Sequence, residues 1–194
     1  MAQKPVVVIT GPSGAGKGTV IGLLAERIPE LGVAVSATTR PRRPGEQDGR
    51  EYYFLSDDDF TRRVEAGEFL EHVDYVSDHR YGTLRSELER IRDEGRVPVF
   101  ELETEGALHV RETMPGTVTI FIDAPLEELE RRLRERATES TGEIGERVAL
   151  AKRQRLQASE FDYVVVNDDL DRAVDEVAGI LRGVLDAAGS ITRT

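Results

Sequence analysis

Short apolar runs alternate along this chain with longer segments in which apolar residues recur at helical spacing. The runs are rich in β-branched residues and predict buried strands over 5–10, 33–36, 97–103, 117–122 and 161–166. The helical spacing predicts helices over 20–28, 57–66, 84–94, 105–113, 125–136, 143–159 and 170–187. Strands that alternate with helices favour an α/β fold with a parallel sheet.

The segment 37–54 follows neither pattern. It contains arginines, prolines, glycines and two adjacent tyrosines, and its Pro and Gly positions predict a turn-rich loop rather than a helix. Arg40, Arg42 and Arg43 are close enough in sequence to repel one another unless an anion or nearby carboxylates neutralise them. The segment is therefore either an anion site or a solvated basic loop.

A glycine-rich stretch connects the first predicted strand to the first predicted helix. It reads Gly11-Pro12-Ser13-Gly14-Ala15-Gly16-Lys17-Gly18-Thr19. A strand, a glycine loop and a helix are the context of a phosphate-binding loop, in which backbone N–H groups and the helix N-terminus hold phosphate oxygens. Lys17 adds a full positive charge. Gly18 stands where many such loops carry the hydroxyl that contacts Mg²⁺, and Thr19 follows it.

Composition narrows the class of protein. The 194 residues are 39% hydrophobic and 32% charged, which is typical of one soluble globular unit. The net charge of −11 argues against nucleic acid and anionic membranes as partners. The absence of cysteine excludes disulfides and thiolate chemistry. Because there is no signal-peptide pattern and no apolar run of membrane length, we expect a cytoplasmic protein.

Two further patterns leave alternatives open. Glu101 and Glu103 end a buried strand, at the edge of the sheet where ligands of parallel α/β proteins bind. They are candidates for Mg²⁺ or for contacts with basic side chains, and an ordinary polar strand end fits the spacing equally well. The two basic helices over 125–136 and 143–159 predict either a mobile arm or a salt-bridged hairpin.

Taken in order, these motifs resemble the guanylate kinase family of P-loop nucleoside monophosphate kinases, from about Val6 to Ala173. The resemblance rests on the loop at 11–19, Ser36-Ala37-Thr38-Thr39-Arg40, Gly45-Glu46, Asp48-Gly49, Tyr52, Glu71, Tyr81-Gly82-Thr83, Glu105-Gly106-Ala107, Arg136 with Thr138-Glu139-Ser140, Arg147, and Val166-Asn167-Asp168-Asp169-Leu170. It implies a single domain with a three-layer P-loop core, a parallel sheet, a GMP-binding insert and a helical lid. The expected parts are a core at about 1–36, 90–125 and 159–188, an insert at 37–89, a lid at 126–158 and a disordered tail at 189–194.

The resemblance also implies substrates and site residues. We expect ATP and GMP as small-molecule substrates and Mg²⁺ as the cofactor. The sequence does not determine whether the protein is a monomer or a homo-oligomer. The implied catalytic residues are Lys17, Arg132, Arg136 and Arg147. The implied ATP-binding residues are Gly11, Pro12, Ser13, Gly14, Ala15, Gly16, Lys17, Gly18, Thr19 and Asn167. The implied GMP-binding residues are Ser36, Arg40, Arg43, Tyr52, Glu71, Tyr81, Gly82, Thr83, Glu101 and Glu103. Thr19 is the candidate for a direct Mg²⁺ contact, which is otherwise water-mediated.

The resemblance assigns Glu71 to the recognition of guanine, and its carboxylate gives a physical reason why guanine is preferred over adenine. A carboxylate accepts hydrogen bonds from guanine N1–H and the 2-amino group, whereas adenine presents a lone pair at N1. The family usually has aspartates at the positions of Glu101 and Glu103 and glutamine at Glu105, so the charge at the first two is kept one methylene further out.

Two alternatives to this function are a kinase for another phosphorylated small molecule, such as a ribose bisphosphate, and a catalytically inactive interaction module. The first should lack the guanine-reading residues Glu71 and Thr83, and the second tends to lose the phosphate loop. Because both features are intact here, the sequence favours the enzyme.

Overall fold

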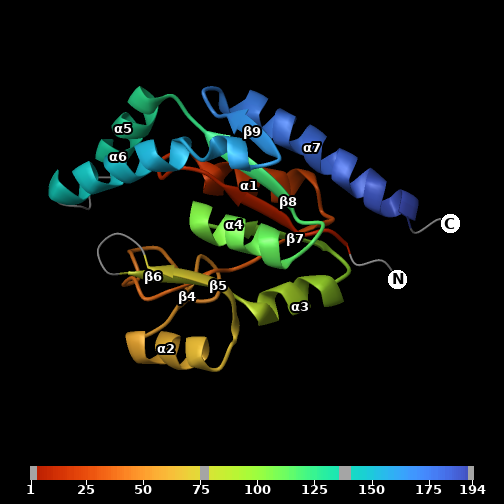
Figure 1. Ribbon diagram of the computed structural model, residues 1–194, viewed down its shortest axis with the longest axis horizontal. Helices are drawn as coiled ribbons and strands as arrows, with labels where there is room; N and C mark the ends of the chain where they lie inside the picture. The colour runs from red at the N-terminus through yellow and green to blue at the C-terminus, as the bar shows by residue number, and fades with distance from the viewer. Residues whose placement is uncertain (1–3, 75–78, 136–140, 192–194) are drawn as a thin grey trace.

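A five-stranded parallel sheet forms the centre of the molecule (Figure 1). The computed structural model describes residues 4–74, 79–135 and 141–191. The strand order is β2 (Leu31–Val33), β7 (Val97–Glu101), β1 (Val7–Thr10), β8 (Val118–Asp123) and β9 (Tyr163–Val166). Val8 of β1 pairs with Phe100 of β7 on one side and with Thr119 of β8 on the other. The predicted α/β class and parallel sheet are therefore confirmed.

Helices cover both faces of this sheet, which makes three layers. Val7 and Ile9 face the core that contains side chains of α1 (Lys17–Arg27) and α7 (Leu170–Ile191). Val6 and Val8 face the opposite core, shared with α3 (Arg85–Asp93) and α4 (Thr104–Thr113). Successive residues of a strand point to opposite faces, so a continuous apolar run is what a strand buried on both sides requires.

A second, four-stranded sheet lies beside the first and was not predicted. Its order is β4 (Tyr53–Phe54), β3 (Ala37–Thr38), β6 (Arg80–Leu84) and β5 (Phe69–Asp74), and it carries α2 (Asp57–Glu65). The interpretation of 37–54 as loop throughout is wrong at β3 and β4, and the motif Tyr81-Gly82-Thr83 lies within β6. Two-residue strands are too short to show a period, and Gly82 suggests a turn although it packs against Phe69.

Element boundaries also differ elsewhere along the chain. The strand predicted over 33–36 lies earlier, at Leu31–Val33. The helix predicted over 143–159 is α6 (Thr141–Arg155) followed by a 3₁₀ turn, η2 (Ala158–Glu160). The helix α7 continues to Ile191, past the predicted end at Ala187, so part of the expected disordered tail is helical; residues 192–194 lie outside the described residues.

The helices α5 (Leu126–Glu135) and α6 form a salt-bridged hairpin at one end of the molecule (Figure 1). Lys152 of α6 lies 3.4 Å from the Glu130 carboxylate of α5, which favours the hairpin among the two sequence-based alternatives. The C-terminal end of α6 is fixed to the core, because Arg155 Nε donates to both carboxylate oxygens of Asp123 at 2.8 and 3.0 Å. Arg136 and Thr138-Glu139-Ser140 lie outside the described residues.

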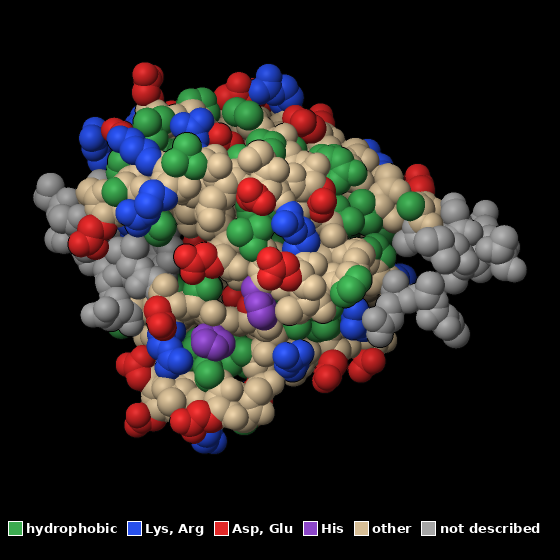
Figure 2. Space-filling view, in the orientation of Figure 1, with side chains coloured by type: hydrophobic (Ala, Val, Ile, Leu, Met, Phe, Trp, Pro, Cys, Tyr) green, Lys and Arg blue, Asp and Glu red, His purple; other side chains and the backbone are tan. Residues whose placement is uncertain are grey.

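Acidic and basic side chains are interspersed over the face shown in Figure 2. Within the described part of the chain, no helix is both long and apolar enough to cross a bilayer.

Candidate active site

A cleft of about 700 Å³ opens between the carboxyl edge of the parallel sheet, the second sheet and α6. Ligands of open parallel sheets bind at this edge. The cleft brings together most of the predicted site residues, although they are far apart in sequence. Those that line it are Ser13, Gly14, Gly16, Lys17, Gly18, Ser36, Arg40, Arg43, Tyr52, Glu71, Tyr81, Gly82, Glu101, Glu103 and Arg147.

The glycine-rich loop at 11–19 is folded as a phosphate-binding loop. Gly11 has a φ of 140°, and a Cβ there would lie 2.0 Å from the carbonyl oxygen of Ile122, so no other residue fits. Gly16 is left-handed, with a φ of 86°, and caps α1. Lys17 is 9% exposed and donates to the carbonyl oxygens of Gly11 and Pro12 at 2.7 and 3.3 Å. The ammonium group is therefore held inside the loop.

Two side chains brace this loop without lining the cleft. Asn167 is buried, and its amide donates to the carbonyl of Ala15 at 2.7 Å. Arg132 donates to the carbonyl of Gly14 at 3.3 Å and to Glu128 at 3.2 Å. The Asn167 side chain thus contacts the loop backbone, and the contact of its segment with adenine stays a prediction.

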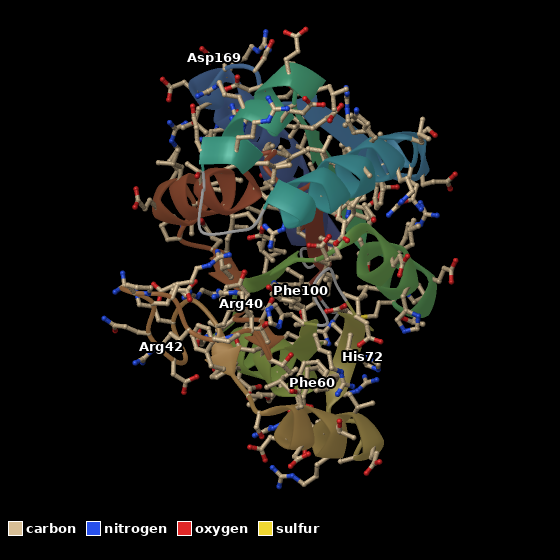
Figure 3. All side chains as sticks on the ribbon, turned by 90° about the vertical axis from the view of Figure 1, so that its left-hand side faces the viewer. Arg40, Arg42, Phe60, His72, Phe100 and Asp169 are labelled. Atoms are coloured by element: carbon tan, nitrogen blue, oxygen red, sulfur yellow. The ribbon has the colours of Figure 1, made fainter. Side chains whose placement is uncertain are left out.

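The arginine-containing loop presents a fixed positive charge to the cleft. Arg40 is 7% exposed and donates to Glu46 at 2.7 Å, and Glu46 also accepts from the Arg43 backbone N–H at 2.7 Å. Although burial opposes the shift, these hydrogen bonds lower the pKa of Glu46. Figure 3 shows Arg40 beside the centre of the molecule and Arg42 at its margin, where Arg42 is exposed. A carboxylate therefore orients the arginines, as the sequence allowed.

Two tyrosines complete this part of the cleft. The guanidinium carbon of Arg40 lies 5.5 Å from the ring centre of Tyr52, and the rings of Tyr52 and Tyr81 meet edge to face at 6.0 Å. Burial, with the nearby charge of Glu101, raises the pKa of the Tyr52 hydroxyl. The Tyr52 hydroxyl is therefore a neutral donor beside Arg40, which suits a phosphate ligand.

Glu71 is the buried carboxyl group of the cleft. It lies on β5 opposite Thr83 of β6 and is 7% exposed. Burial raises the pKa of Glu71 to about 7, against the lowering effect of the Thr83 hydroxyl and backbone N–H, and the charge of Glu103 adds to the increase. Thr83 is fully buried and acts on the cleft through Glu71, because it does not itself line the cleft.

The strand-end carboxylates face different neighbours. Glu103 accepts a hydrogen bond of 2.9 Å from the amide of Gln154 on α6, so it joins the sheet edge to the hairpin. Glu101 lies beside the phosphate-binding loop, since a Cβ on Gly18 would be 3.6 Å from Glu101 Oε2. Thr19 is exposed and does not line the cleft, whereas Gly18 and Glu101 do.

The donor set fits a Mg²⁺ ion that is held chiefly by phosphate oxygens and water. Among the described residues there is no group of three or more side chains placed to hold a metal. Mg²⁺ commonly keeps several waters and uses one or two carboxylates together with substrate phosphates. Glu101 beside the phosphate-binding loop meets that requirement.

The sequence did not reveal several polar residues that hold the site together. Glu87 of α3 accepts from the Val35 backbone N–H at 2.8 Å and from the Tyr53 hydroxyl at 3.1 Å, which ties α3 to the connection between β2 and β3 and to β4 of the second sheet. Gln154 and the Asp123–Arg155 pair fix α6. Each of these contacts joins segments that are distant in sequence, so no local spacing marks it. Glu46, which accepts from Arg40, differs from them because it lies within the Gly45-Glu46 motif that the sequence singled out.

Comparison with known proteins gives a consistent family. The family model described as guanylate kinase matches residues 2–183. The guanylate kinase of Synechococcus sp. (strain JA-3-3Ab) is 45% identical over 177 residues, which cover 91% of this chain and 81% of that protein. The guanylate kinase of Rubrobacter xylanophilus is 44% identical over 186 residues, which cover 95% and 97% of the two chains.

Solved structures agree with the sequence comparisons. The crystal structure of guanylate kinase from Anaplasma phagocytophilum matches with a TM-score of 0.77 at 31% identity, over 94% of this chain and 87% of that one. A shikimate kinase from Bacteroides thetaiotaomicron matches with a TM-score of 0.51 at 17% identity, over 94% and 98% of the two chains, and supports the fold alone. The phosphate-binding loop, the cleft and these relatives together show that the chain belongs to the guanylate kinase family, the nucleoside monophosphate kinases that phosphorylate GMP.

Proposed function

We propose that this chain transfers the γ-phosphoryl group of ATP to GMP within the 700 Å³ cleft, and that the residues described above carry out the reaction. The observation that carries the proposal is that one cleft contains both a phosphate-binding loop and a buried carboxyl group, Glu71, beside a second cationic site at Arg40 and Arg43. Two phosphate sites and one base site match two nucleotides bound end to end.

GMP binds the second sheet in this proposal. Arg40, Arg43, Tyr52 and Tyr81 hold its phosphate, and Glu71 accepts hydrogen bonds from guanine N1–H and the 2-amino group. The remaining acceptor-site residues are Ser36, Gly82, Thr83, Glu101 and Glu103. An unpaired polar group buried on binding costs about 1–3 kcal/mol, so adenine, which mismatches Glu71 twice, is disfavoured by roughly a thousandfold.

ATP binds the phosphate-binding loop, with Lys17 against its terminal phosphates. Asn167 and Arg132 support the loop from outside, as their hydrogen bonds to Ala15 and Gly14 indicate. Glu101, which lies beside the loop and lines the cleft, would hold Mg²⁺ there, whereas Thr19 is exposed and does not line the cleft. Bound Mg²⁺ neutralises developing negative charge on the phosphates and orients them.

The reaction needs positioning and charge stabilisation rather than a general base. The phosphate of GMP is largely a dianion near neutral pH, because its second pKa is about 6. An oxygen of that dianion attacks the γ-phosphorus in line, and the bond to the β-γ bridging oxygen breaks as ADP leaves. Lys17 and Arg147, which line the cleft, stabilise the charge that spreads over the transferred group, and Arg132 joins them when the lid closes. Arg136 is proposed for the same role and lies outside the described residues.

The parts of the molecule take distinct tasks in this reaction. Residues 37–89 form the GMP-binding insert and residues 126–158 form the lid, and closure of both over the cleft excludes the water that would otherwise hydrolyse ATP. We place the enzyme in the cytoplasm as part of purine nucleotide metabolism and GMP recycling.

A coupled assay of ADP formation tests the function. We expect turnover with GMP to exceed turnover with AMP, UMP or a ribose bisphosphate by at least about a hundredfold in kcat/KM. Equal rates with GMP and a ribose bisphosphate would sink the guanylate assignment. Calorimetry separates the inactive-module alternative, since a module would bind GMP and leave ATP–Mg²⁺ unbound.

A further inference from the structure

We propose that Gly106 is a specificity-determining positioning residue, whose missing side chain leaves the space in which the Glu71 carboxylate is seated. The inference rests on the proposed role of Glu71 as the guanine reader. Gly106 lies in the first turn of α4, and the helix contacts the second sheet through this position.

The contact between α4 and β5 leaves no room for a side chain. A Cβ built on Gly106 would lie 2.4 Å from Glu71 Oε2 and 3.1 Å from Glu71 Cδ. Real Cβ atoms do not approach other heavy atoms this closely, so one of the two must move. The clashing atoms are the far end of a flexible side chain, which makes the carboxylate, rather than the helix backbone, the part that moves.

The backbone does not require glycine at this position. Gly106 is absent from the positive-φ glycines of the described residues and lies in regular α-helix. Alanine is preferred over glycine inside a helix by about 0.5–1 kcal/mol. Gly106 therefore lowers local helix stability, and the space that it leaves for Glu71 is the gain that offsets this cost.

A displaced Glu71 carboxylate has two directions to go, and both impair guanine reading. Glu71 lines the 700 Å³ cleft on one side and a second cleft of about 430 Å³ on the other, where Gly106, Glu105 and His109 are its neighbours. Movement into the first cleft occupies the space of the base. Movement into the second separates the carboxylate from Thr83, its cross-strand neighbour on β6.

The direct test is the variant Gly106→Ala. We expect kcat/KM for GMP to fall by about 10- to 100-fold, mainly through a higher KM for GMP, because hydrogen bonds to a charged group are lost. The KM for ATP and the melting temperature should stay within error of the parent protein. The preference for GMP over AMP should fall by a similar factor. A merely structural role would change ATP and GMP kinetics together.

The matched control is Gly179→Ala in α7. Gly179 is also helical, and a Cβ there meets nothing within 4 Å. We expect parent values of KM for both nucleotides. If Gly179→Ala raised the KM for GMP as much as Gly106→Ala does, the effect would belong to glycine replacement in general and the proposal would be overturned.

A double-mutant cycle with Glu71→Ala decides whether the effect passes through Glu71. In the Glu71→Ala background, Gly106→Ala should change kcat/KM for GMP by less than about twofold, since the clashing atoms are gone. A full-sized effect in that background overturns the proposal. If Gly106→Ala alone does not fold, the double variant should fold, and its failure to do so overturns the proposal as well.

The same measurements separate the two levels of inference. Unchanged selectivity between GMP and AMP in Glu71→Gln would remove Glu71 as the guanine reader, and the proposed function would fail at that residue. If Glu71→Gln lost the selectivity for GMP while Gly106→Ala kept it, Glu71 would stand as the residue that recognises guanine. The proposed role of Gly106 would then be rejected.

Discussion

At the scale of single residues, Glu71 is a carboxyl group whose surroundings disfavour its charge. Its pKa is raised to about 7 by burial, so the protonated and ionised forms are both populated near neutral pH. Only the ionised form accepts hydrogen bonds from both guanine N1–H and the 2-amino group. The protonated form can donate to N1 of adenine, so the two protonation states favour different bases.

We therefore predict that the selectivity for GMP over AMP increases with pH. Between about pH 6 and pH 8 Glu71 loses its proton, and the ratio of kcat/KM for the two nucleotides should rise several-fold with an inflection near 7. Taking the ratio cancels the ionisation of the nucleotide phosphates, which is the same in both. The pH profile of Glu71→Gln should be flat, and an unchanged inflection in that variant would assign the titration to another group.

Lys17 gives a second prediction at this scale. Its ammonium is buried within the phosphate-binding loop, and no other lysine lines the cleft among the described residues. Lys17→Ala should lower kcat by about 10²- to 10³-fold, because a charge that stabilises the transferred phosphoryl group is lost. The KM for GMP should change little, since Lys17 belongs to the donor half of the cleft.

The control for Lys17 is Lys4→Ala, which removes a lysine from the opposite end of the sheet, where its ammonium donates to the carbonyl of Gly95. Parent kinetics are expected for Lys4→Ala in steady-state assays. Parent turnover in Lys17→Ala would contradict the donor-site assignment.

At the scale of elements, Glu87 holds α3 against the segments that lead to and through the second sheet. It is 3% exposed and accepts from the Val35 N–H, the Tyr53 hydroxyl and Arg90. Glu87→Ala should lower the free energy of unfolding by about 2–4 kcal/mol, because three partly buried donors lose their buried acceptor. Urea denaturation followed by circular dichroism measures this change.

The matched control uses the same arginine. Glu94 also accepts from Arg90, at 2.8 Å, but its side chain is exposed to solvent. Glu94→Ala should lower the free energy of unfolding far less than Glu87→Ala does, because exposed ion pairs contribute little. Equal costs for the two variants would show that Glu87 contributes only as a surface partner of Arg90.

The elements also show where sequence reasoning succeeds and where it stops. Strands such as Val7–Thr10 were predicted from their continuous apolar runs. Such a run occurs because both faces of the strand are buried. The helix α2 lies within the predicted range 57–66, and its N-cap Ser56 accepts from the Asp59 N–H at 3.1 Å. The strands β3 and β4 are two residues long and depend on pairing with distant partners, so no local period marks them.

The site divides in the same way. The phosphate-binding loop was recognised because its glycines and lysine lie in one continuous stretch whose backbone needs them. The hydrogen bond from Gln154 to Glu103 and the seating of Glu71 against Gly106 join residues separated by tens of positions. Such contacts depend on how layers pack, and the sequence contains no spacing that encodes them.

At the scale of the whole molecule, the net charge is negative, whereas cationic and acidic side chains line the cleft in equal number. The chain carries a net charge of −11, which repels anionic nucleotides at long range. Lys17, Arg40, Arg43 and Arg147 gather at the cleft. Solvent screens charges that are more than about 10 Å apart at moderate ionic strength, so the nearby arginines decide binding.

The cleft lies between two sheets that do not pair with each other, and a ligand that contacts both should draw them together. In our proposal, GMP contacts Glu101 and Glu103 at the carboxyl edge of the parallel sheet, Glu71 and Tyr81 on the second sheet, and Arg40 in the loop that follows β3. Such a ligand binds most tightly when the two sheets approach each other, and therefore shifts the population toward the closed arrangement. GMP should lower the radius of gyration measured by small-angle X-ray scattering, and it should slow amide exchange at 34–36, which connect β2 to β3.

AMP is the informative comparison for this closure. AMP offers the same phosphate to Arg40 and Arg43, but its base lacks the N–H groups that donate to Glu71. We therefore expect AMP to bind through its phosphate without the contact between its base and Glu71. At concentrations that saturate binding, we expect a smaller change in radius with AMP than with GMP. Equal compaction by both would mean that the phosphate alone drives closure. If neither nucleotide compacted the protein, the two sheets would move as one rigid body. The lid would then be the part that closes. It is held to the core by the contacts Asp123–Arg155 and Glu103–Gln154.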